Sequence, residues 1–210
     1  MLTIVQELGH LALAVIQAGA YIFRSGCDIG LYLDLYQTRR GELLEEYRYH
    51  DQKMDNYEWT VYTTWQLSFE RLKTHTARAA AFLQHCAYLH HEGISEAPFQ
   101  NAVVNIASPF DDQEPNSLRN AKDVLGAFVT SGTWDTPKFL DLLSEIRNYS
   151  LIDFDDKAKT YSGHPLIHYW LCITISNGET ALACTQCILG MAVNWEFGGL
   201  YIQMDTTPSY

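Results

Sequence analysis

Apolar and polar residues follow one another at helical spacing through most of the chain. Residues 3–23 are apolar on most faces, which predicts a helix that is largely buried. From Ile29 to Tyr47 the apolar residues keep to one face, which predicts a second helix. Residues 48–57 are polar and charged and indicate a boundary, so residues 1–57 are expected to form a short helical domain.

The same spacing continues beyond this boundary. Residues 58–106 predict three helices, and an acidic loop with prolines follows at residues 107–117. Thr136 and Pro137 predict the N-cap and the first residue of a further helix. The residues of that helix that are expected to face inward are Phe139, Leu140, Leu142, Leu143, Ile146 and Tyr149.

A β-hairpin is predicted after this helix. Two short apolar strands within residues 151–161 flank a polar turn at Asp155–Ala158. Helices around such a hairpin predict a winged-helix-like domain over residues 58–178. Residues 179–210 are expected to form a C-terminal helix and an irregular tail, because the pattern dissolves after Trp195. The expected fold is mostly α, with a short helical domain followed by a winged-helix-like domain with one small β-hairpin.

His164 lies where the predicted hairpin meets the next helix, which Pro165 can open. The N-terminus of a helix presents unpaired N–H groups, so a histidine at this place is well positioned to meet an anion. An equally simple interpretation is that the imidazole bonds backbone groups or water at a strand-to-helix junction.

Three segments, in this order, carry a resemblance to a known family. Leu8–Ile22 contains the run HLALA, Val61–Leu72 reads VYTTWQLSFERL, and Gly163–Pro165 reads GHP. Together they resemble the C-terminal half of the nucleotide-binding region of NB-ARC-type STAND NTPases, especially the fungal members followed by tetratricopeptide repeats. The resemblance covers roughly residues 3–190.

This resemblance implies sites that act only together with another domain. In the family a P-loop domain holds the nucleotide, a helical-domain motif lies beside the adenine, and a winged-helix histidine approaches the ADP phosphates. By position Ala12 falls in the first motif and His164 is the histidine, so both are expected to be nucleotide-proximal only with a partner NTPase domain. Ala12 replaces the motif's proline, which removes a rigid backbone angle. Gly163 and Pro165 replace the flanking Met and Asp, and fungal members often show His-Pro at this place.

The sequence contains no phosphate cradle. No Gly-x-x-x-x-Gly-Lys-Ser/Thr occurs, and phosphoryl transfer needs such a backbone nest, a lysine and a magnesium site. We therefore expect no catalytic residues, no metal, no cofactor and no hydrolysis of ATP by the chain alone. The expected function is a non-catalytic regulatory or interaction module of a STAND signalling NTPase. It is expected to be a fragment that binds a P-loop NTPase domain or another protein, and that reaches ADP or ATP only through that domain.

Composition limits the alternatives. The formal net charge is -11, and the chain lacks the clustered Lys and Arg of nucleic-acid-binding surfaces. A winged-helix nucleic-acid-binding protein is nevertheless the alternative that the architecture permits. The apolar run at residues 11–23 follows no basic residue and is too short for a comfortable membrane span. We therefore expect a cytoplasmic protein with no membrane partner.

A small enzyme that depends on cysteine or a metal is a second alternative. The five cysteines show no paired framework. Cys184 and Cys187 have the spacing of a redox motif, but their apolar neighbours predict a plain helix. His85, His90 and His91 cluster locally, without a second pair of ligands at the spacing of a zinc site.

Overall fold

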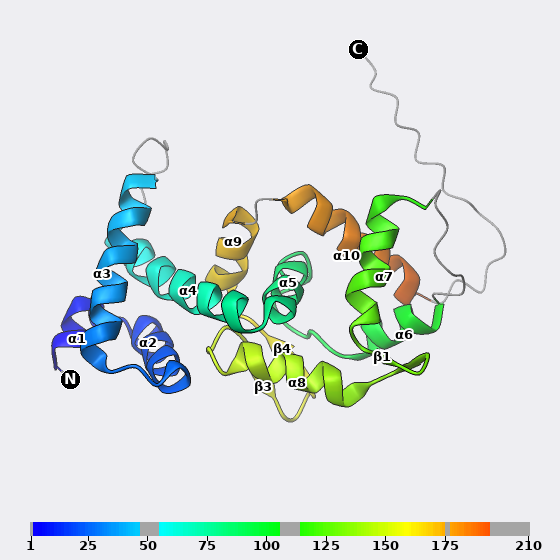
Figure 1. Ribbon diagram of the computed structural model, residues 1–210, viewed down its shortest axis with the longest axis horizontal. Helices are drawn as coiled ribbons and strands as arrows, with labels where there is room; N and C mark the ends of the chain where they lie inside the picture. The colour runs from blue at the N-terminus through cyan, green and yellow to red at the C-terminus, as the bar shows by residue number, and fades with distance from the viewer. Residues whose placement is uncertain (1, 47–54, 106–113, 175–176, 194–210) are drawn as a thin grey trace, which may run out of the picture.

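The computed structural model describes residues 2–46, 55–105, 114–174 and 177–193. Within these ranges it consists of ten helices and two short antiparallel strand pairs (Figure 1). The predicted mostly-α fold is therefore confirmed. The polar stretch at 48–57, the acidic loop at 107–117 and the tail after Trp195 lie wholly or mainly outside the described residues.

The N-terminal part contains three helices, α1 (Leu2–Glu7), α2 (Ala12–Ser25) and α3 (Ile29–Glu46). The prediction of one continuous helix over residues 3–23 is wrong. Gly9 and His10 both adopt the left-handed backbone conformation, with φ angles of 61° and 59°. A right-handed helix cannot continue through such residues, so the chain turns between α1 and α2. The helix predicted from Ile29 is present as α3.

Helix α4 (Asn56–His75) connects this part to the rest of the molecule (Figure 1). It begins with a capping box, in which the Asp55 side chain accepts the backbone N–H of Glu58 and the Glu58 side chain accepts that of Asp55. Leu67 packs into a core formed with α1, α2 and α3. Trp65 and Leu72 belong to the larger core that fills the rest of the protein. One helix thus contributes to both cores.

The larger core is formed mainly by the elements that follow α4, and we call this the winged-helix-like part because such a domain was predicted there. Helices α5 (Ala77–Cys86), α6 (Ala97–Asn105), α7 (Asn116–Gly126) and α8 (Thr136–Arg147) precede a hairpin of β3 (Asp153–Asp155) and β4 (Thr160–Ser162). Phe154 pairs with Tyr161 across this hairpin. On the other edge of β4, Ile94 and Tyr161 exchange backbone hydrogen bonds of 2.9 and 2.7 Å. The predicted hairpin and its turn are confirmed, and Ile94 adds a third extended segment to it.

A second hairpin, β1 (Val129–Thr130) with β2 (Thr133–Trp134), was not predicted. Ser131 and Gly132 form its turn with φ angles of 51° and 81°, as a two-residue type I′ turn requires. The hairpin also changes the start of α8. Asp135, and not Thr136, is the N-cap, because its carboxylate accepts the backbone N–H of Lys138 at 3.1 Å. Hydrogen bonds from Thr130 and Lys138 lower the pKa of Asp135.

The inward face of α8 differs from the prediction at one residue. Leu140 is 45% exposed, whereas Phe139, Leu142, Leu143 and Ile146 are buried as expected. The buried positions recur at steps of three and four, and Leu140 falls about 100° away from Phe139 around the helix. Two further helices complete the described fold, α9 (Pro165–Thr174) and α10 (Gly178–Ala192), and the latter confirms the helix predicted over residues 179–193.

Aromatic rings fill the centre of the larger core. The Phe82 ring lies 5.0 Å from that of Phe99, 5.6 Å from that of Phe128 and 5.8 Å from that of Phe139, measured between centroids. Trp134 of the second hairpin lies 5.4 Å from both Phe128 and Phe139. These contacts join α5, α6, α8 and β2 in one cluster, whose edge-to-face pairs add to the energy of burial.

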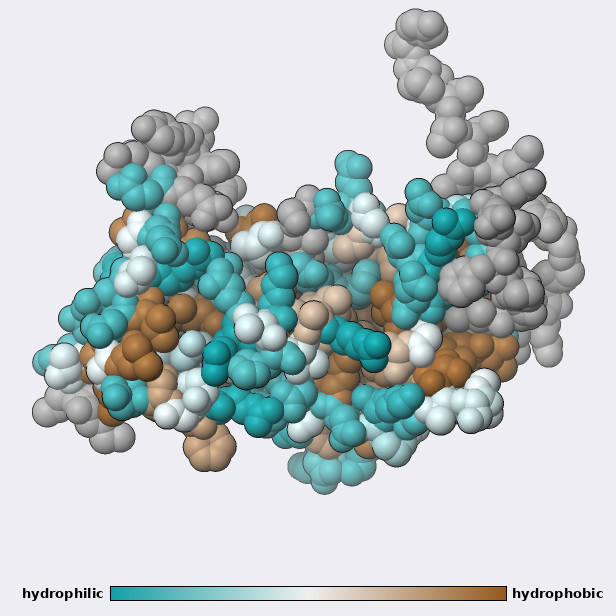
Figure 2. Space-filling view, in the orientation of Figure 1, coloured by the Kyte–Doolittle hydropathy of each residue, from teal (hydrophilic) through white to brown (hydrophobic). Residues whose placement is uncertain are grey.

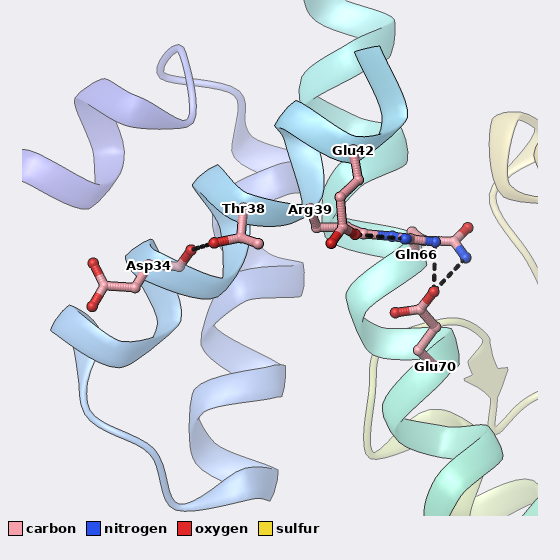
Figure 3. A network of polar contacts seen from close by, with 6 residues as sticks. All are labelled: Asp34, Thr38, Arg39, Glu42, Gln66 and Glu70. Atoms are coloured by element: carbon pink, nitrogen blue, oxygen red, sulfur yellow. Dashed lines mark hydrogen bonds and ion pairs between the residues drawn. The ribbon is translucent and has the colours of Figure 1, made fainter. Parts of the chain in front are cut away.

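A polar network joins α3 to α4 at the surface (Figure 3). Arg39 forms ion pairs with Glu42 of its own helix at 2.8 Å and with Glu70 of α4 at 2.6 Å. Gln66 donates to the same Glu70 carboxylate at 2.9 Å. Exposed pairs contribute little to stability, so the network mainly fixes how α3 lies against α4. Behind it, the buried hydroxyls of Tyr32, Tyr36 and Ser68 have no hydrogen-bond partner within the described ranges.

The aromatic cluster gives a first prediction. Phe139→Ala should lower the free energy of unfolding by about 3–5 kcal/mol, because it removes a fully buried ring and leaves a cavity. Its neighbour provides the control: Leu140→Ala should cost less than about 1 kcal/mol, since that side chain is largely exposed. Urea unfolding followed by circular dichroism measures both, and equal losses would place α8 in a different orientation.

The unpartnered hydroxyls give a prediction of opposite sign. Tyr36→Phe keeps the ring beside Tyr32 but removes a buried hydroxyl that no described residue bonds. Desolvation of such a group is unfavourable, so this variant should be as stable as the wild type or up to about 1 kcal/mol more stable. Ser68→Ala should behave in the same way. A loss above 1 kcal/mol in the same urea experiment would reveal a hydrogen bond to these hydroxyls, for example from ordered water.

Candidate functional site

His164 occupies the position that the sequence predicted, between β4 and α9. Its Nδ1 accepts the backbone N–H of Leu166 at 3.2 Å, and the side chain is exposed. The imidazole therefore caps the first turn of α9, because it satisfies one of the N–H groups that a helix start leaves unpaired. No hydrogen bond involves Nε2 among the residues that the structure describes, which leaves one ring nitrogen for a ligand.

The loop between α5 and α6 holds this junction in place. Gly163 donates its backbone N–H to the carbonyl of His91 at 2.8 Å. His91 in turn lies between two other imidazoles, with centroid distances of 4.5 Å to His90 and 6.1 Å to His168. His168 Nε2 lies 2.7 Å from the carbonyl oxygen of Leu89. The histidines thus tie the loop to α9.

These histidines do not form a metal site. Across the described part of the chain, no group of three or more His, Cys, Asp or Glu side chains is arranged to hold an ion. The cavity that His91 and His168 line measures about 20 Å³ and is otherwise mostly apolar. Such a volume holds about one water molecule. It cannot hold a nucleotide, so a ligand of His164 has to approach from the exposed side of the ring.

Ala12, the second predicted site residue, is the first residue of α2 and is exposed. The left-handed backbone of Gly9 and His10 brings the chain around to start this helix. Leu11 is the N-cap and makes no side-chain capping bond. The N-cap side chain therefore satisfies none of the unpaired backbone N–H groups in the first turn of α2. No hydrogen bond or ion pair within the described residues connects Ala12 with His164.

Helix α2 carries an exposed apolar face, although the helix predicted over residues 3–23 was expected to be largely buried. The face, here called the α2 stripe, consists of Ala12, Ile16, Gly19 and Phe23, spaced by four, three and four residues. Ile16 is 59% exposed and Phe23 is 89% exposed. A Cβ atom added at Gly19 would meet nothing within 4 Å. The opposite face, with Ala14, Gln17, Ala18 and Tyr21, is buried, so α2 is only half covered.

Hydrophobic atoms gather on the surface over the N-terminal helices in Figure 2. Large apolar side chains of a helix are normally covered, and a contiguous exposed set marks an interaction surface. The apolar character of residues 3–23, which predicted a buried helix, was thus the signal for this surface.

A small junction links α2 to the end of α8. The amide of Gln17, which is buried, donates to the backbone carbonyl of Ser150, a residue with a φ of 52°. Arg24 donates to both carboxylate oxygens of Glu145 at 2.9 and 2.7 Å, and these bonds raise the pKa of Arg24. No sequence pattern pointed to these contacts, which join residues more than a hundred positions apart.

Cys86 and Cys184 do not have the lowered pKa of a nucleophilic cysteine. Burial raises the pKa of Cys86 to about 12 and that of Cys184 to about 11. Both thiols are therefore protonated at neutral pH, whereas a nucleophilic cysteine needs a lowered pKa. Cys184 and Cys187 both lie on α10, which confirms the helix predicted there. All five cysteines are free.

Comparison with known proteins gives no relative, since no family model, curated protein or solved structure matches the chain. The resemblance to the NB-ARC family therefore stays a prediction. None of the described helices combines the length and the apolar character that a membrane crossing requires.

Thiol burial makes a testable prediction about reactivity. In the native protein at pH 8, iodoacetamide should leave Cys86 and Cys184 unmodified, because only about 0.1% of a thiol with a pKa near 11 is thiolate at that pH. Cys27 and Cys187, which are partly exposed, should react first. Intact-mass and peptide mass spectrometry identify the labelled residues. Fast labelling of Cys184 would instead support a cysteine-dependent enzyme.

Proposed function

We propose that this chain is a non-catalytic regulatory module of an NB-ARC-type STAND signalling NTPase, acting in the cytoplasm. It docks through the α2 stripe onto a P-loop nucleotide-binding domain, and His164 then faces the bound nucleotide. The observation that carries the proposal is the uncovered apolar face of α2, which lies in the segment that resembles the helical domain of that family.

The α2 stripe suits a surface that is covered in a complete assembly. Full burial of a side chain such as Ile16 or Phe23 contributes about 1.5–3 kcal/mol each. Left in water, both side chains forgo this energy. Gly19 lies between them and Ala12 lies one turn before Ile16; both carry little or no side chain, so a partner can approach the helix closely. A protein domain, with its large complementary surface, is the kind of partner that covers such a face.

His164 can act as a single hydrogen-bond donor toward an anion. Its Nδ1 accepts an N–H and therefore carries no proton, which leaves the proton of the neutral ring on Nε2. A phosphate oxygen of ADP held by a docked domain would accept a hydrogen bond from this N–H. The same phosphate would face the start of α9, where the helix dipole favours negative charge.

The surface of the winged-helix-like part does not favour nucleic acid. Helix α8, which precedes the wing, exposes Lys138 and Arg147 but also Asp141, and Lys138 is engaged by Asp135 at 3.9 Å. In the wing, Lys159 is paired with Asp156 at 2.5 Å. Binding to a phosphate backbone needs several unpaired cations on one face, and these cations alternate with acids.

The chain alone should not bind nucleotide. Isothermal titration with ADP should give no saturable heat, because His164 offers one donor and the cavity beside it admits about one water molecule. Submicromolar binding of ADP without a partner would refute the proposed role. The same titration with ATP and Mg²⁺ serves as a second arm.

Docking can be tested in trans with the P-loop domain of a fungal NB-ARC NTPase, loaded with ADP or free of nucleotide. We expect Ile16→Glu/Phe23→Glu to weaken binding of the loaded domain at least ten-fold, measured by biolayer interferometry. Val104→Glu, which changes a side chain that is 75% exposed on α6, is the matched control and should have no effect. His164→Ala should weaken binding only of the loaded domain. Equal binding by the wild type and the double variant would overturn the docking surface.

A further inference from the structure

A groove runs along the outer face of α5, apart from both the α2 stripe and His164. It consists of three hollows in series, of about 310 Å³ beside the start of α10, about 210 Å³ over the middle of α5 and about 500 Å³ beside α8. Asp123 and Val124 line both the first and the second hollow, and Arg78 and Phe128 line both the second and the third. Neighbouring hollows thus share lining residues and lie side by side. We call this surface the α5 groove.

The floor of the α5 groove is apolar. Phe82, Phe128 and Leu142 lie beneath the middle hollow and are almost fully buried. Ala81 and Ala127 lie above them and have short side chains that reach the solvent. In Figure 1, α5 lies to the left of α7 and above α8, and both helices contribute residues to the middle hollow. A ligand could thus approach the α5 backbone closely and cover apolar surface along its length.

The charges along the groove are largely unpaired. Asp123 lines the first and middle hollows and Asp141 lines the third. Both are exposed, and neither has an ion-pair partner among the residues described. Arg78 lies between them and is also unpaired there. The other charged residues of the third hollow are engaged, Lys138 with Asp135 and Glu145 with Arg24. The chain carries a net charge of -11. A complementary ligand is therefore apolar in the middle and basic at its sides.

We propose that the α5 groove binds a short amphipathic helix of a partner protein. Apolar residues of this helix at positions i, i+4 and i+7 enter the three hollows, and Lys or Arg residues beside them meet Asp123 and Asp141. Seven residues of a helix rise about 10 Å, which fits within the length of about 15 Å of the ten-residue helix α5. A small molecule fits less well, because small-molecule sites enclose most of their ligand. The inference goes beyond the proposed function and uses different residues.

The test uses a defined probe peptide. The probe is a fluorescein-labelled peptide of 14 residues, which as a helix makes about four turns and is about 20 Å long. It carries Leu at i, i+4 and i+7 and Lys and Ala elsewhere. Two control peptides accompany it. The first has the same composition in scrambled order, and the second has Glu in place of each Lys. By fluorescence anisotropy, the full chain should bind the probe peptide at least ten-fold more tightly than either control peptide. Equal affinity for the ordered and scrambled peptides would mean unspecific attraction to an acidic protein and would overturn the proposal.

Variants locate the binding. Ala81→Trp fills the middle hollow and should weaken the ordered peptide at least ten-fold, while Ala158→Trp in the exposed β3–β4 turn should not. Asp123→Asn/Asp141→Asn should weaken it about three- to ten-fold, and Asp34→Asn/Asp153→Asn, which removes the same charge elsewhere, should not. Far-UV circular dichroism checks folding, and if Ala81→Trp does not fold, the two aspartate pairs decide.

Unchanged binding by both groove variants would overturn the proposal. Ile16→Glu/Phe23→Glu should retain peptide binding, so a failure of the α2 docking surface and a failure of the α5 groove give different results.

Discussion

The structure depends on the packing of α4 into two cores at once. Trp65 and Leu72 are fully buried in the larger core, and Leu67 is buried in the smaller one with α1, α2 and α3. A helix of 20 residues with apolar groups on more than one face cannot satisfy both cores unless helices lie on either side of it. The position of the N-terminal helices relative to the winged-helix-like part is therefore set first by α4, and only second by direct contacts.

Those direct contacts are both apolar and polar, because Leu11 and Leu13 at the start of α2 pack against the larger core. The polar contacts between α2 and the end of α8 include the Gln17–Ser150 hydrogen bond and the Arg24–Glu145 ion pair. The ion pair is partly exposed, so its contribution to stability is small. The buried amide of Gln17 matters more, because a broken bond would leave it unsatisfied. The two parts are thus joined by a stiff helix and a specific contact, with the α2 stripe left open beside them.

Much of this fold could be read from residue spacing, and the failures have physical reasons. Helices α3, α4, α5 and α8 repeat their apolar residues at three and four, and the β3–β4 hairpin alternates around a polar turn. The break between α1 and α2 at Gly9 and His10 does not disturb the apolar pattern and contains no proline. The spacing of apolar residues therefore did not predict it. The strands β1 and β2 have two residues each, which is too short for alternation to register. Only the Ser131-Gly132 pair hinted at their turn.

The residues of the candidate site also fall into those that the sequence predicted and those that it did not. The position of His164 followed from Pro165 and the hairpin, both of which are local. Leu140 was misplaced because apolar character alone does not say which side of a helix faces the core. The contacts of His91 with Gly163 and of Gln17 with Ser150 join distant parts of the chain and depend on how the helices pack. The exposure of Phe23 has the same origin, since the sequence shows an apolar residue but not whether a neighbour covers it.

The His164 side chain caps the first turn of α9 through its Nδ1 atom. The lone pair of His164 Nδ1 already accepts the Leu166 N–H, so a ligand that turned the ring away from the helix would leave this N–H without its partner. An anion that binds Nε2 in the present ring orientation leaves the cap intact. A ligand that moves the His164 ring would therefore change how firmly the first turn of α9 is held.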